Sequence, residues 1–130
     1  MRTQPNNNIY RDDNLLTHPI SGTRETPKYL NGKEFENWLH ETYGGQPSFK
    51  VSGREFDGAI GNRWYEAKSG RYWKDVTSTD KGWNKFTSDM GARQRIAQDN
   101  GATYELHSNT PIPQNVKNWL DKKGIKYYQY

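Results

Sequence analysis

The sequence contains no cysteine, which excludes a disulfide framework and thiolate chemistry. It also contains no apolar run near the roughly 20 residues that a membrane-spanning helix requires, and no basic-then-apolar leader at its start. We therefore expect a soluble domain with no membrane partner, and we expect any secretion signal to lie outside these 130 residues.

Hydrophobic residues are scarce as well. They make up only 31% of the chain, and the mean hydropathy is −1.24. Aromatic side chains compensate, because the five Trp, nine Tyr and four Phe each bury a large area. A chain of 130 residues is long enough for one domain with a modest core. We therefore predict a single folded domain whose core is largely aromatic.

The charge of the chain is mildly basic and unevenly distributed. The net charge is +4, and residues 51–130 hold thirteen of the nineteen Lys and Arg but nine of the fifteen Asp and Glu. A basic excess favours an anionic partner such as nucleic acid. An ordinary solvated surface carries a similar excess, so the motifs must decide between the two interpretations.

Turn residues and apolar spacing divide the chain into an arm and a domain. Residues 1–29 lack periodicity and are rich in Asn, Thr, Pro and Arg, which is typical of a linker. Residues 30–130 form the predicted domain, and its first helix lies within 29–45, with Asn31 as N-cap, Glu34 in the capping-box position and Gly44 as the stop. Strands are expected at 47–52, 54–60, 63–69, 103–109 and 125–130, and further helices at 80–100 and 111–124. The order α-β-β-β-α-β-α-β predicts an α/β or α+β fold with helices around a central mixed sheet.

The stretch "REFDGAIGNRWYEAKSGRYW" predicts a β-hairpin with residues 61–62 as its two-residue turn. In that register Asp57 lies opposite Glu66, and Lys68 follows on the same face because side chains alternate along a strand. The other pairs are Ile60 with Arg63, Ala59 with Trp64, Gly58 with Tyr65, Phe56 with Ala67, and Glu55 with Lys68. The opposite face carries Phe56, Ile60 and Tyr65.

Two carboxylates opposed in this way repel each other by about 3 kcal/mol at an effective dielectric constant near 20. A divalent metal such as Mg²⁺ or Mn²⁺, bound by oxygen atoms of Asp57 and Glu66, relieves that repulsion. Lys68 beside the metal then holds or deprotonates a water, which suits phosphodiester hydrolysis. The alternative is an exposed hairpin face on which Lys68 simply pairs with Glu55.

The segment "SGRYWKDVTSTDKGWNK" is expected to be a polar connector leading into the helix at 80–100. Its basic residues, Arg71, Lys74, Lys81 and Lys85, are mixed with Tyr72, Trp73 and Trp83. Such mixtures contact phosphates and stack on exposed bases, although aromatics in a loop also cap a core. His107, on the strand at 103–109, is a weaker site candidate, because an isolated histidine is more often structural.

The motif "FDG…YEAK" resembles the D-(x)n-E-x-K signature of the PD-(D/E)xK nucleases, with Phe56 in place of the signature's proline. The expected element order is similar to the αβββαβ core of that superfamily, with a further helix and strand at the C-terminus. More narrowly, residues 30–130 resemble the restriction-endonuclease-fold toxins at the C-termini of polymorphic and contact-dependent growth-inhibition proteins.

The resemblance implies a role for each matching residue. Asp57 and Glu66 become metal ligands, with the Ala67 carbonyl as a third, and Lys68 becomes the catalytic lysine. An acidic residue of the first helix often joins such sites, and Glu34 is the candidate here, ahead of Glu36 and Glu41. From the helix at 80–100, Arg93 or Gln94 would reach a substrate phosphate or the attacking water.

The resemblance also implies a function. The domain would be a metal-dependent nuclease, with Mg²⁺, Mn²⁺ or Zn²⁺ as cofactor, delivered by a larger secreted or cell-surface protein into the cytoplasm of a neighbouring bacterium. Its substrate would be DNA or tRNA, a cognate immunity protein would neutralise it, and a host factor could activate it. Two alternatives stay open: a tRNA nuclease that works without metal, using the same three side chains as acid, base and charge stabiliser, and a nucleic-acid-binding module without catalysis.

Overall fold

The computed structural model describes residues 26–130, and the expected linker at residues 1–29 lies almost wholly outside this range. The described part begins with a 3-10 turn, η1, at Pro27–Tyr29. The helices are α2 (Lys33–Tyr43), α3 (Tyr72–Ser78), α4 (Asp80–Asp99) and α5 (Gln114–Lys123). The strands are β1 (Phe49–Val51), β2 (Arg54–Phe56), β3 (Gly58–Ile60), β4 (Arg63–Lys68), β5 (Thr103–Ser108) and β6 (Lys126–Gln129). No helix among the described residues is long and apolar enough to cross a membrane.

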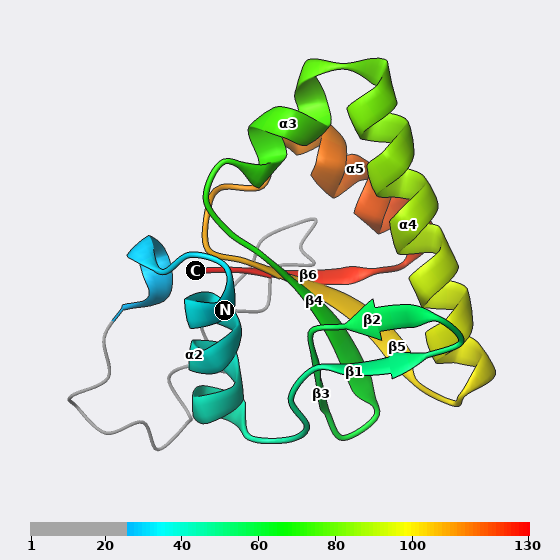
Figure 1. Ribbon diagram of the computed structural model, residues 1–130. Coiled ribbons are helices and arrows are strands. Elements are labelled where there is room, and N and C mark those ends of the chain that lie inside the picture. Colours follow the sequence, from blue (N-terminus) through cyan, green and yellow to red (C-terminus); the bar gives the residue numbers. More distant parts are fainter. Residues whose placement is uncertain (1–25) are drawn as a thin grey trace.

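The central sheet has the strand order β3-β4-β5-β6. Strand β3 is antiparallel to β4, whereas β4, β5 and β6 are parallel to one another. Helices α3 and α4 connect β4 to β5, and α5 connects β5 to β6 (Figure 1). The domain is therefore a mixed α and β fold around a mixed sheet, as the sequence pattern predicts.

The sheet separates two cores. On one face, Tyr65 and Tyr128 pack with Phe35, Trp38 and Leu39 of α2. The core of the opposite face joins the sheet to α3, α4 and α5, and its members include Trp73, Val76, Phe86, Met90, Tyr104, Leu106, Val116, Leu120 and Tyr127. Both cores are rich in aromatic side chains, so the prediction of an aromatic core is confirmed.

The predicted strand at 54–60 is wrong in one respect, because it breaks at Asp57 into β2 and β3. The predicted pairs of β3 with β4 are confirmed, from Ile60 with Arg63 to Gly58 with Tyr65. Beyond them the ladder ends, because the Ala67 N–H donates to Asp57 Oδ2 at 2.8 Å instead of to a backbone carbonyl. The expected pairs of Asp57 with Glu66, of Phe56 with Ala67 and of Glu55 with Lys68 are therefore wrong.

Strand β2 instead pairs with β1 in a separate two-stranded hairpin. Its turn residues, Ser52 and Gly53, both have positive φ (51° and 80°), as a type I′ turn requires. Because the chain bends at Asp57, Phe56 packs with Phe49, Trp64 and Tyr104 in the core of the α4 face. The expectation that Phe56 shares a face with Tyr65 is therefore wrong.

Two other local predictions need correction. The segment after β4 is not only a connector, since it contains the seven-residue helix α3 with Trp73 and Val76 buried. Helix α2 has Gly32 rather than Asn31 as its N-cap, and only half of the capping box forms, where Glu34 Oε1 accepts from the Asn31 N–H at 3.4 Å. The Gly32 N–H donates to Ser69 Oγ at 2.8 Å, which ties the start of α2 to the end of β4.

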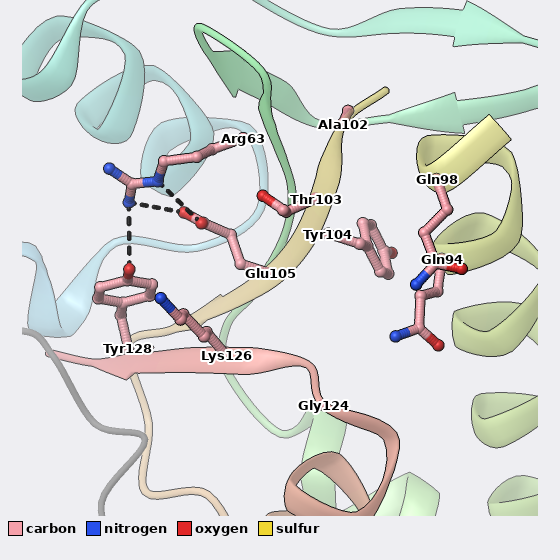
Figure 2. A pocket seen from close by; sticks show the side chains of 10 residues that line it. All are labelled: Arg63, Gln94, Gln98, Ala102, Thr103, Tyr104, Glu105, Gly124, Lys126 and Tyr128. Carbon is pink, nitrogen blue, oxygen red and sulfur yellow. Dashed lines mark hydrogen bonds and ion pairs between the residues drawn. The ribbon is translucent and has the colours of Figure 1, made fainter. Parts of the chain in front are cut away.

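A buried polar network lies on the α2 face of the sheet. Arg63 donates two hydrogen bonds to Glu105, both of 2.9 Å, and a third to the Tyr128 hydroxyl at 3.3 Å (Figure 2). His107 lies 2.7 Å from Glu105 Oε2 and 2.8 Å from the Tyr130 hydroxyl, with only 1% of its surface exposed. His107 therefore belongs to a structural network, and it lies on the opposite face from Glu66 and Lys68.

Candidate active site

Asp57 lies where β2 ends and β3 begins, and two hydrogen bonds fix it against β4. Its N–H donates to the Tyr65 carbonyl at 3.0 Å, and its Oδ2 accepts from the Ala67 N–H at 2.8 Å. Gly58 follows because a Cβ at that position would lie 2.2 Å from the Tyr65 hydroxyl oxygen. The bend after β2 thus turns the Asp57 carboxylate toward the end of β4.

Glu66 and Lys68 point from β4 toward the α3 and α4 side of the sheet. Glu66 is 7% exposed, and its Oε2 lies 3.0 Å from Lys68 Nζ. The Lys68 ammonium also lies 4.1 Å from the centre of the Tyr72 ring, at the start of α3. A carboxylate and an aromatic face therefore hold Lys68 in one position.

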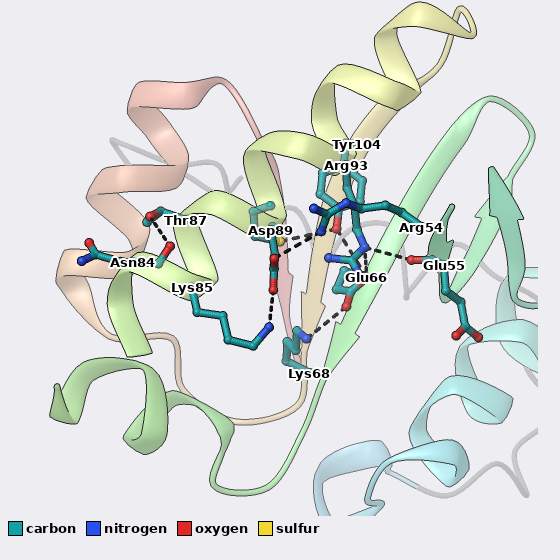
Figure 3. A network of polar contacts seen from close by, with 11 residues as sticks. Arg54, Glu55, Glu66, Lys68, Asn84, Lys85, Thr87, Asp89, Arg93 and Tyr104 are labelled. Carbon is teal, nitrogen blue, oxygen red and sulfur yellow. Dashed lines mark hydrogen bonds and ion pairs between the residues drawn. The ribbon is translucent and has the colours of Figure 1, made fainter. Parts of the chain in front are cut away.

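Two residues outside β4 complete the surroundings of Glu66. Arg93 of α4 lies with its Nε 3.9 Å from Glu66 Oε1, and the same nitrogen donates to the Glu55 carbonyl at 2.9 Å (Figure 3). The Tyr104 hydroxyl of β5 lies 3.4 Å from Glu66 Oε1. Glu66 is therefore contacted from its own strand, from β5 and from α4.

The pKa of Asp57 is raised to about 8 from an ordinary value of 3.8. Burial is the main cause, and the negative charges of Glu66 and then Glu36 add to it. The hydrogen bond from the Ala67 N–H and the positive charge of Lys68 oppose the rise without cancelling it. Burial and the neighbouring carboxylates therefore favour the neutral form of Asp57, and a cation bound beside it would favour the charged form.

The pKa of Lys68 moves in the direction that keeps the amine charged. Burial lowers it, but the charge and hydrogen bond of Glu66, together with Tyr72 and Asp57, raise it more, so the pKa of Lys68 ends above 10.5. Lys68 is therefore an ammonium at neutral pH. It is suited to stabilising negative charge and not to removing a proton from water.

A cleft of about 400 Å³ opens beside Glu66 and Lys68. Its floor is apolar, formed by Val76, Phe86 and Met90, and its walls come from β4, α3 and α4. The remaining lining residues are Tyr72, Asp75, Gly82, Lys85, Asp89 and Arg93. The volume lies within the range typical of ligand pockets, and the mixture of basic and acidic groups with an aromatic ring suits a nucleotide.

On helix α2, Glu34 and Glu36 have different surroundings. Glu34 is exposed and accepts the Asn31 N–H. Glu36 is partly buried, its charge contributes to raising the pKa of Asp57, and its Oε1 lies 3.2 Å from Lys33 Nζ. Helical spacing places the two glutamates on opposite borders of the buried face formed by Phe35, Trp38 and Leu39. The sequence pattern alone therefore does not show which glutamate lies nearer to Asp57.

The other expected substrate contacts divide into two groups. Arg93 reaches the site, whereas the Gln94 side chain donates to the Lys123 carbonyl at 2.9 Å and closes the end of α5. Gln94 lines a second cavity, of about 160 Å³, with Gln98 beside it (Figure 2). Arg71 and Lys74 are exposed at the start of α3 and do not line the cleft.

The donor set at Asp57 and Glu66 suits a hard divalent cation. Within residues 26–130, no three His, Cys, Asp or Glu side chains are grouped closely enough to hold a metal ion by themselves. The N–H and C=O of one strand residue point to the same side, so the Ala67 carbonyl faces the edge of β4 that Asp57 occupies. Two carboxylates and one carbonyl leave positions for water and phosphate oxygens, which is how Mg²⁺ is commonly bound.

Comparison of the chain with protein-family models, with curated proteins and with solved structures finds no match. The geometry and charges of Asp57, Glu66 and Lys68 are therefore the basis for the function proposed below.

Proposed function

We propose that this protein is a metal-dependent nuclease that hydrolyses phosphodiester bonds at Asp57, Glu66 and Lys68. The observation that carries the proposal is the geometry at the end of β4, where Asp57 Oδ2 accepts from the Ala67 N–H at 2.8 Å and Glu66 Oε2 lies 3.0 Å from Lys68 Nζ. Burial and the charge of Glu66 raise the pKa of Asp57 at this position. A divalent cation at this position removes both the desolvation cost of the charge and the carboxylate repulsion.

Each residue has a definite role in the proposed reaction. Asp57, Glu66 and the Ala67 carbonyl would hold the cation, which would supply Lewis-acid chemistry and a water of lowered pKa. Lys68, kept charged by Glu66 and Tyr72, stabilises the negative charge that develops on the phosphoryl oxygens. Arg93 lies in the same cleft and adds a second positive charge for the phosphate.

The arrangement of elements supports assignment to the restriction-endonuclease-like fold. Helix α2 covers one face of the sheet, the antiparallel pair β3 and β4 carries the motif, and α4 leads to the parallel strand β5. Helix α5 and β6 extend this core. The hairpin of β1 and β2 replaces the continuous long strand that the sequence pattern predicts.

The biological setting follows from the resemblance of the motif and not from the site. We propose that the domain is the toxic part of a larger delivered protein, that it acts on DNA or tRNA in the cytoplasm of a target bacterium, and that a cognate immunity protein protects the producing cell.

A metal-free nuclease is the second candidate. The burial of Asp57 beside Glu66 favours it, because both raise the pKa of Asp57 and so favour its neutral, proton-carrying form, while Lys68 stays charged. A protonated carboxyl can donate to a leaving oxygen as a general acid. A binding module without catalysis is the third candidate.

One gel assay tests these proposals together. The purified domain is incubated with plasmid DNA and with total tRNA, each with Mg²⁺, Mn²⁺, Zn²⁺ or EDTA, beside the Asp57→Ala and Lys68→Ala variants. Cleavage that requires metal and disappears in both variants supports the metal-dependent nuclease. Cleavage that persists in EDTA supports the metal-free alternative, and intact substrates in every wild-type lane, with binding retained, support the binding module.

A further inference from the structure

Asp89 of α4 holds two cations at the rim of the cleft. Its Oδ1 accepts from Arg54 Nη1 of β2 at 3.2 Å, and its Oδ2 accepts from Lys85 Nζ at 2.8 Å (Figure 3). All three side chains remain in contact with solvent, with exposed fractions of 38% for Arg54, 76% for Lys85 and 30% for Asp89. Ion pairs this exposed contribute little to stability, so both cations can exchange their partner for an anion from solvent.

The cluster is continuous with the candidate active site. Lys85 and Asp89 line the same cleft as Glu66, Lys68 and Arg93. Arg54 enters from the β1–β2 hairpin, on the opposite side of Asp89 from Lys85. A polynucleotide with one phosphate at Lys68 and Arg93 would extend along the cleft toward the pair of cations around Asp89.

The Asp89 carboxylate accepts from a guanidinium and an ammonium, the same two donors that a phosphate group would use. Both cations are preferred donors for phosphate oxygens, and a guanidinium presents several N–H groups in a fixed plane. The charges of Arg54 and Lys85 also hold the pKa of Asp89 below its ordinary value of 3.8, against the upward effect of burial. Asp89 is therefore charged at neutral pH and competes for both cations.

We propose that Arg54 and Lys85 form a second phosphate-binding subsite for the nucleic acid, and that Asp89 is a built-in competitor which a backbone phosphate displaces. The inference rests on the proposed function, since its ligand is the same polynucleotide. It restricts the substrate class to chains with at least two phosphates. It also implies that Asp89 lowers the affinity of the protein for nucleic acid.

If Asp89 competes with phosphate, substitutions of Asp89 and of its two cations should change the affinity for nucleic acid in opposite directions. Asp89→Asn frees both cations and tightens binding by about two- to fivefold at low salt, whereas Arg54→Gln and Lys85→Gln each weaken it by a similar factor. The two cation variants also lower the slope of log affinity against log salt by about 0.7–0.9 each, the value for one lost phosphate contact. An ion pair with only a structural role predicts lower stability in all three variants and unchanged binding.

The test is fluorescence anisotropy with fluorescein-labelled single-stranded RNA and duplex DNA of about 20 nucleotides, in EDTA, between about 50 and 200 mM KCl. The matched control is Lys122→Gln, an exposed lysine near the end of α5 that does not line the cleft. Urea unfolding verifies that every variant is folded, and a gel afterwards verifies that the oligonucleotides are intact.

The outcomes separate the subsite from the proposed function. Tighter binding by Asp89→Asn with weaker binding by both cation variants, and no change for Lys122→Gln, is the expected result. Wild-type binding that none of the three variants alters refutes the subsite and leaves the proposed function standing. Weaker binding by Asp89→Asn refutes the competitor role, because that result means that Asp89 positions Arg54 and Lys85 for phosphate binding. A wild-type protein that binds neither oligonucleotide in EDTA overturns the subsite, because Arg54 and Lys85 need no metal to bind phosphate. The proposed function is judged separately, by the gel assay with added metal.

Discussion

Replacing Asp57 by Asn should stabilise the metal-free protein at pH 8. The pKa of Asp57 is about 8 in the folded protein and about 4 in the unfolded chain. Between these values the folded state holds a proton that the unfolded state has released, so stability falls as pH rises. Asparagine resembles the protonated carboxyl, and its amide oxygen still accepts the Ala67 N–H.

The full shift, from 3.8 to about 8, converts to about 6 kcal/mol at about 1.4 kcal/mol per pKa unit. Asp57 is partly exposed, so solvent screens the effect and we expect about half of that, about 3 kcal/mol at pH 8, falling toward zero near pH 4. The effect is opposite to the usual cost of altering a buried polar residue, because the wild-type carboxylate is the destabilising form.

The assay is urea unfolding followed by tryptophan fluorescence at pH 5, 6, 7 and 8 in EDTA. Asp99→Asn, an exposed aspartate at the end of α4, is the matched control and should not alter the pH dependence. Parallel stability curves for wild type and Asp57→Asn, or a less stable Asp57→Asn at pH 8, would refute the electrostatic account of the site.

Three further predictions concern the framework that positions the site. Gly58→Ala should destabilise the fold by about 1–3 kcal/mol in urea unfolding, because the new Cβ meets the Tyr65 ring at 2.4 Å, whereas Gly91→Ala has open space and should gain up to about 1 kcal/mol. Tyr65→Phe should be neutral or slightly stabilising, because the buried Tyr65 hydroxyl has no hydrogen-bond partner among residues 26–130; a loss above about 1 kcal/mol would contradict this. Glu105→Gln should cost about 3 kcal/mol at pH 7, since it removes the buried charge that pairs with Arg63, and an unchanged unfolding midpoint would contradict that role.

The β3–β4 hairpin shows which features of the fold can be predicted from the sequence and which cannot. Turn chemistry at residues 61–62 fixes the register of β3 and β4, and the three pairs nearest the turn are confirmed. The register does not extend past Asp57, because the side chain of Asp57 takes the Ala67 N–H that a longer ladder would use. That competition between a side chain and the backbone depends on the folded geometry and leaves no periodic signal.

The sequence pattern does not predict helix α3, and the reason is different. Its sequence, YWKDVTS, is short and rich in aromatic and β-branched residues, which have low helix propensity. Burial of Trp73 and Val76, one turn apart, stabilises it instead. The residues that meet at the rim of the cleft also cannot be predicted from local sequence. Arg54 and Asp89 form a hydrogen bond although they are 35 positions apart, and no local pattern links them.

The cleavage rate of Lys68→Met under single-turnover conditions tests the central claim most directly. It is measured on whichever nucleic acid the wild-type protein cuts, with Lys122→Met as the matched control. Loss of an ammonium that stabilises transition-state charge should lower the rate at saturating substrate by about 10²–10³-fold while the control stays at the wild-type rate. A folded Lys68→Met protein that cuts within about twofold of wild type, where the account requires a loss of at least 10²-fold, would contradict the assignment of Asp57, Glu66 and Lys68 as the active site.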